Sequence, residues 1–115
     1  MKIIYHIGKE INSDTVVRRG ILDDDTQEMF IDDGGKRYIL GDIQHVEVAK
    51  FSMGTMVKIK NGDDTVFLAV PRIFIDRGTG FAVINYFATK KAGRLLSLAM
   101  QYQKREKTGG SDLRS

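Results

Sequence analysis

The sequence contains no cysteine, which excludes disulfide bonds and thiolate metal sites. It has two histidines, His6 and His45, so imidazole groups for metal binding or acid-base catalysis are few. A long hydrophobic run is also absent, because the apolar N-terminal segment is interrupted at His6 and Gly8, too early for a secretory signal or a membrane-spanning helix. These absences predict a soluble, cytoplasmic protein.

Complete catalytic or cofactor-binding motifs are also missing. Residues 78–80 (Gly-Thr-Gly) precede a predicted helix, but the P-loop Lys-Ser/Thr and the full dinucleotide pattern are lacking. The aspartates at 23–25 would suit a hard cation such as Ca²⁺, yet the calcium-loop pattern is not satisfied. Acid-base chemistry at His45 would need a carboxylate such as Asp42 beside it. We therefore predict that the protein is not an enzyme, and the sequence indicates no metal, cofactor or small-molecule substrate.

What the chain does have is enough apolar residues for one core. It contains 115 residues, 42% of them hydrophobic, which is the size of one ordinary domain. The charge is uneven. Residues 1–77 hold 11 Lys and Arg against 13 Asp and Glu, a net charge of −2, whereas residues 78–115 hold 7 against 2, a net charge of +5. The C-terminal third is therefore basic.

Short apolar segments separated by Gly, Asn and Asp predict a series of β-strands. These strands span residues 2–7, 15–22, 28–32, 37–40, 46–51, 56–60 and 65–70. Asn61-Gly62 is the strongest hairpin signal, because both residues tolerate the left-handed conformation of a type I′ turn. Segment 65–70 is almost entirely apolar, which predicts a strand covered on both faces and ended by Pro71.

A long amphipathic helix is predicted near the C-terminus. Apolar residues recur at the helical period from Phe81 to Tyr102, and Thr79 is the expected N-cap. This helix is expected to cover the second face of segment 65–70. Order is expected to end at residues 108–111, and residues 104–115 are expected to form a basic, flexible tail.

Two segments carry a resemblance to a known family. Residues 20–22 (Gly-Ile-Leu) lie near the end of an early strand, and residues 38–46 (Tyr-Ile-Leu-Gly-Asp-Ile-Gln-His-Val) follow a pattern of an aliphatic residue, Asp-Ile and Val. With the C-terminal helix, residues 10–102 resemble the bacterial PH-like and GRAM-type domains of the pleckstrin-homology superfold. The resemblance implies a mostly β fold, with a PH-like bent antiparallel sheet or partly open barrel capped by one C-terminal helix, in a single domain of residues 1–103.

The resemblance also implies a non-enzymatic binding or assembly module. Phosphoinositide-binding PH domains hold the headgroup with basic residues of their first two strands and the intervening loop, and the matching residues here are Arg18 and Arg19. The loop assigned to that position, residues 23–28, carries four carboxylates, which repel a phosphorylated headgroup. A protein partner or a second copy of the chain is therefore expected at a strand edge or in the groove between helix and sheet.

Two further surfaces are candidates. Phe74 and Ile75 belong to an apolar run after Pro71, which marks an interface if it is exposed and the lid of the barrel if it is not. The basic helix and tail would bind anionic lipid or nucleic acid, or else form a solvated helix face. The residues concerned are Lys90, Lys91, Arg94, Lys104, Arg105 and Lys107.

Overall fold

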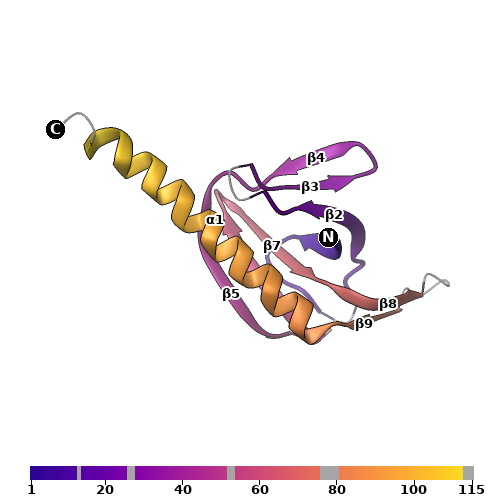
Figure 1. The fold of residues 1–115 in the computed structure, drawn as a ribbon. Helices are drawn as coiled ribbons and strands as arrows, with labels where there is room; N and C mark the ends of the chain where they lie inside the picture. Colours follow the sequence, from indigo (N-terminus) through magenta and orange to yellow (C-terminus); the bar gives the residue numbers. More distant parts are fainter. Residues whose placement is uncertain (13, 26–27, 52–53, 76–80, 113–115) are drawn as a thin grey trace.

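Nine strands precede one long helix in the described part of the chain (Figure 1). The computed structural model describes residues 1–12, 14–25, 28–51, 54–75 and 81–112; of residues 73–75, 81–82 and 107–112 it describes the backbone alone. The elements are β1 (Lys2–Ile7), β2 (Arg18–Asp23), β3 (Phe30–Asp33), β4 (Lys36–Ile39), β5 (Ile43–Phe51), β6 (Gly54–Asn61), β7 (Asp64–Ala69), β8 (Pro71–Ile75), β9 (Phe81–Ile84) and α1 (Tyr86–Asp112).

The first seven strands form one antiparallel sheet in the order β4-β3-β2-β1-β7-β6-β5. Its two halves join where β1 pairs with β7, with Ile4 opposite Ala69 and Ile7 opposite Val66. The sheet is bent and partly open, with β4 and β5 as its edges, and α1 lies across it (Figure 1). The predicted fold, a mostly β, PH-like sheet capped by one C-terminal helix, is confirmed.

Glycine makes two of the hairpin turns possible. Between β3 and β4, Gly34 and Gly35 have φ angles of 60° and 95°, in the region that side chains disfavour. Between β6 and β7, Gly62 has a φ of 58°, while Asn61 pairs with Asp64 as the last residue of β6. No described non-glycine residue has a positive φ, so the predicted type I′ turn with Asn61 in the left-handed conformation is wrong.

The helix begins later than the sequence predicted. Residues 81–84 form β9, which pairs with β8 as a separate two-stranded sheet, and α1 starts at Tyr86. Asn85 is the N-cap: its side-chain Oδ1 accepts the Ala88 N–H at 3.1 Å, and its carbonyl accepts the Thr89 N–H at 2.9 Å. The predicted cap, Thr79, lies outside the described residues. The apolar spacing from Phe81 fits either a strand or a helix, and pairing with β8 decides it.

The main core lies between the inner face of the sheet and α1. It is lined from the sheet by apolar residues of all seven strands or their ends and from the helix by small and aliphatic residues. Its fully buried members include Ile3, Leu22, Ile31, Leu40, Val57, Ile59, Val66, Leu68, Ala92, Leu96 and Ala99. Burial of these side chains is the dominant force holding the helix on the sheet.

A second apolar cluster covers the opposite face of β1, β6 and β7. Its buried members are Ile4, Met56, Phe67 and Ala69, and the residues packed against them are Ile11, Val17, Phe51 and Ile84. Strand β7 is therefore buried on both faces, as its apolar sequence predicted. The helix covers one of these faces. The other is covered by Ile11 and Val17 from the segment between β1 and β2, by Phe51 of β5 and by Ile84 of β9.

The helix continues to Asp112, through the residues where the sequence predicted a tail. Figure 1 shows its C-terminal part projecting past the sheet, at the end opposite the β8–β9 hairpin. No helix in the described residues has the length and apolar character that crossing a bilayer requires.

Candidate functional site

A groove runs between the edge strand β5 and the helix α1. The two elements approach each other closely at Gly93, where an added Cβ would lie 2.5 Å from Cγ2 of Val48. Glycine in a helix interior costs about 1 kcal/mol relative to alanine. The close contact with β5 explains its presence at this position.

The groove encloses about 370 Å³. Its walls are Val46 and Val48 from β5 and Lys90, Gly93, Arg94, Ser97 and Leu98 from α1. Val48 is 39% exposed and Leu98 53% exposed, although both are aliphatic. Apolar side chains left in water along a groove are typical of an interaction site.

The groove borders an edge of the sheet. Strand β5 pairs with β6 on one side and, among the described strands, has no neighbour on the other. Such an edge presents unpaired N–H and C=O groups that another strand can pair with. At one end the Ile43 N–H is already engaged by the Gln103 side chain of α1 at 2.8 Å, and a bulge interrupts the register between Ile43 and His45. The accessible edge therefore lies beyond the bulge, from His45 onward.

The charges around the groove are positive. Alternation along β5 places Lys50 on the same face as Val46 and Val48, while Glu47 lies on the opposite face, paired with Lys58. On the helix side, Lys90, Lys91 and Arg94 are all exposed. Of the basic residues that the sequence singled out, Lys90 and Arg94 line the groove, Lys91 is adjacent, and Lys104 and Arg105 lie farther along α1.

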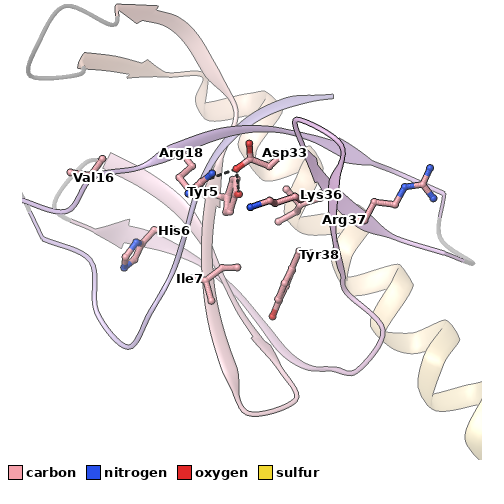
Figure 2. A pocket seen from close by; sticks show the side chains of 10 residues that line it. Tyr5, His6, Ile7, Val16, Arg18, Asp33, Lys36, Arg37 and Tyr38 are labelled. Atoms are coloured by element: carbon pink, nitrogen blue, oxygen red, sulfur yellow. Dashed lines mark hydrogen bonds and ion pairs between the residues drawn. The ribbon is translucent and has the colours of Figure 1, made fainter.

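A second pocket, of about 310 Å³, lies at the ends of β1 to β4 (Figure 2). The Tyr5 hydroxyl donates a hydrogen bond to Oδ2 of Asp33 at 2.5 Å, and Arg18 Nε donates to the same oxygen at 2.7 Å. Figure 2 shows both side chains converging on Asp33, whereas Arg37 points away from them. The hydrogen bond from Tyr5, and then that from Arg18, holds the pKa of Asp33 below its usual value.

We expect Asp33→Asn to lower stability more at neutral pH than in acid. Because the folded-state pKa of Asp33 is depressed, its stabilisation is present above the unfolded-state pKa of about 3.9 and is lost as the pH falls through the folded-state value. Urea unfolding of wild type and Asp33→Asn at pH 6 and pH 3 measures the difference, which should shrink in acid. Tyr5→Phe should show the same trend, and a pH-independent difference in both variants would contradict this account.

Arg18 and Arg19 lie on opposite faces of β2 and do not act together. Arg18 faces Asp33, and Arg19 lines a different cleft on the outer face of the sheet. Strand β2 is the first strand of the segment that carries the family resemblance, and the acidic segment 23–28 connects it to β3, as the sequence predicted. Whether either arginine binds a partner stays a prediction.

The other sequence candidates belong to β8 and to the N-terminal part of β5. The backbone of Phe74 and Ile75 belongs to β8, but their side chains lie outside the described part of the structure, so neither the interface nor the lid interpretation is tested. His45 is exposed on β5, and the Asp42 carboxylate accepts a hydrogen bond from Gln44 at 3.4 Å. Among the described residues, no three His, Asp or Glu side chains gather as a metal site.

Sequence reasoning missed the apolar part of the groove. Val48 and Ser97 look like ordinary strand and helix residues, and Val46 stands out only as the last residue of the family pattern. Leu98 falls within the apolar stripe from Phe81 to Tyr102, which predicts a buried position. The one available signal was Gly93, which is unfavourable in the middle of a helix unless something packs closely against it.

Comparison with known proteins adds no relatives, because no family model, curated protein or solved structure matches this chain.

Proposed function

We propose that this protein is a non-enzymatic binding module that takes an extended peptide as an added strand along β5. The peptide belongs to a protein partner or to a second copy of the chain. The observation that carries the proposal is that an open sheet edge and a partly exposed apolar groove lie side by side. Either feature alone is common, but together they match what strand addition requires.

The two features have separate roles in this mode of binding. Hydrogen bonds between the peptide backbone and β5 supply affinity without depending on the peptide's sequence. Alternate side chains of an added strand point to the same face, so every second residue would enter the groove beside Val48 and Leu98. A volume of about 370 Å³ accommodates a small number of apolar side chains.

The charge of the groove defines the peptide further. Lys90 and Arg94 line it, and Lys50 lies on the same face of β5. A peptide with apolar residues at alternate positions and carboxylates beside them complements this surface. Because these cations are exposed to water, their contribution should be modest and should decrease with salt, whereas the apolar and backbone contacts should remain.

We expect Val48→Lys to weaken peptide binding about tenfold or more, which corresponds to about 1.4 kcal/mol. The substitution places an ammonium beside Lys90 and Arg94 and fills the apolar groove, while Val48 is exposed enough for the fold to tolerate the change. The probes are twelve-residue peptides selected from a random library on the wild-type protein, titrated by fluorescence anisotropy. Val16→Lys is the matched control, because Val16 is also exposed and lies outside the groove. Equal binding by wild type and Val48→Lys would refute the proposed site.

Light scattering distinguishes the two sources of the peptide. If the partner is a second copy, the protein should form a concentration-dependent oligomer that resists high salt and that Val48→Lys dissociates. If the partner is another protein, wild type should remain a monomer and still bind the selected peptides.

A second candidate function rests on a different observation. Phe87 is 77% exposed at the start of α1, its ring lies 5.4 Å from that of Tyr86, and Lys90 and Lys91 follow one turn later. An exposed aromatic residue beside lysines suits an anionic membrane surface. Vesicles of phosphatidylcholine with and without phosphatidylserine serve as a further arm of the binding experiment. Salt-sensitive binding that needs the anionic lipid and Phe87 would favour this candidate over the peptide.

A further inference from the structure

A cleft of about 680 Å³ lies on the face of the sheet turned away from the main core. One wall is the outer face of β1, β2 and β3, where Lys2 lies opposite Ile21 and Ile21 lies opposite Asp32. The other wall is the beginning of β8, with Pro71 and Arg72. We call this space, which is also lined by Arg19, the outer cleft.

Basic side chains from three strands meet at the outer cleft. Lys2, Arg19 and Arg72 are all exposed, and among the described lining residues Asp32 supplies a half-buried carboxylate. Oδ1 of Asp32 accepts the Gly35 N–H at 3.0 Å and so helps to hold the β3–β4 turn. The described residues of the cleft therefore carry an excess of positive charge, and two of their three cations are guanidinium groups, which bind phosphate and carboxylate oxygens in pairs.

The outer cleft also has an apolar part. Ile21 is 52% exposed, although it lies in the middle of β2, and Pro71 forms part of the opposite wall. Gly34 and Gly35 leave the neighbouring turn open, since a Cβ on either would meet no atom within 4 Å. The volume falls within the usual range for small-molecule sites.

We propose that the outer cleft binds an amphipathic organic anion, with its apolar body on Ile21 and Pro71 and its phosphate, sulfonate or carboxylate head between Arg19, Arg72 and Lys2. The ligand must have both an apolar and an anionic part, because the cationic and apolar side chains line the same cleft. In the described part of the chain the cleft shares no lining residue with the groove between β5 and α1, so the proposal stands independently of the proposed peptide binding.

The test uses 8-anilinonaphthalene-1-sulfonate, whose fluorescence rises when its aromatic body leaves water. Arg19→Gln and Arg72→Gln should each weaken its binding about tenfold, and Arg105→Gln, at an exposed arginine of α1 that lines neither the outer cleft nor the groove, should leave it unchanged. Amide NMR signals should shift at Lys2, Ile21 and Gly35. Unchanged binding in both cleft variants, or shifts confined to β5 and α1, would overturn the proposal. Circular dichroism of each variant excludes a signal from unfolded protein.

Competition separates the two parts of the ligand. Octyl phosphate should displace the probe at concentrations where inorganic phosphate and octanol do not. Displacement by inorganic phosphate alone, as effective as by octyl phosphate, would overturn the apolar part of the proposal. Equally effective displacement by octanol would overturn the anionic part.

Discussion

Replacing Asn61 with alanine is expected to lower the free energy of unfolding by about 3 kcal/mol, because it removes the three hydrogen bonds of a nearly buried side chain. Asn61 is 9% exposed. Its Oδ1 accepts the Asp42 N–H at 2.9 Å, and its Nδ2 donates to the Tyr38 hydroxyl and the Ile39 carbonyl, each at 3.0 Å. One side chain on β6 thus ties together the end of β4 and the connection to β5, beside the opening of the sheet.

Urea unfolding measures this loss, and Asn12→Ala is the matched control. Asn12 is exposed, and its side-chain oxygen accepts hydrogen bonds from Asp14 and Thr15 within its own turn. Its replacement should cost about 1 kcal/mol or less. Similar losses in the two variants would show that the hydrogen bonds of Asn61 do not hold the sheet as described.

The second large effect is expected at Leu96, whose replacement by alanine should cost about 3 kcal/mol, within the usual range of 2–5 for a buried leucine. Leu96 is fully buried in the main core, where α1 packs on the sheet. Truncation removes apolar contact and leaves a cavity that rigid neighbouring strands cannot fill.

Leu98→Ala is the control for this prediction, because Leu98 lies two residues away on the same helix and is 53% exposed. Its loss should change stability by about 0.5 kcal/mol, yet it should weaken peptide binding, since Leu98 lines the groove. Leu96→Ala should lower stability strongly but leave peptide binding unchanged at temperatures where the variant stays folded. A large stability loss in Leu98→Ala would mean that the groove is part of the core and not a binding surface.

The order of elements could be predicted from local patterns, because strand alternation and turn residues act over a few positions. Val57 and Ile59, for example, alternate with lysines exactly as a half-buried strand requires. The pairing of β1 with β7 could not be predicted in this way, because it places Ile7 opposite Val66, far apart in the sequence, and depends on the whole fold. The β8–β9 hairpin was missed for a related reason: residues 81–84 fit a helical stripe, and only their partner strand makes them a strand.

Of the residues that line the candidate site, the sequence indicated only the basic ones. Lys90 and Arg94 stand out in sequence because they belong to a basic segment, whereas Val48 becomes informative only when α1 lies beside β5. The role of Asn61 was also hidden. Asn-Gly is a strong turn signal, but its asparagine is used here as a hydrogen-bonding side chain near the sheet opening, and the glycine alone takes the left-handed conformation.

The most direct test of the central claim is amide hydrogen exchange of the wild-type protein with and without a selected peptide. Strand addition predicts that exchange slows at alternate residues of β5 between His45 and Lys50, because edge N–H groups gain partners, and that Val48→Lys abolishes the change. If the peptide binds without slowing exchange on β5, or slows it only at residues around the outer cleft, then β5 is not the binding edge and the proposed function is wrong.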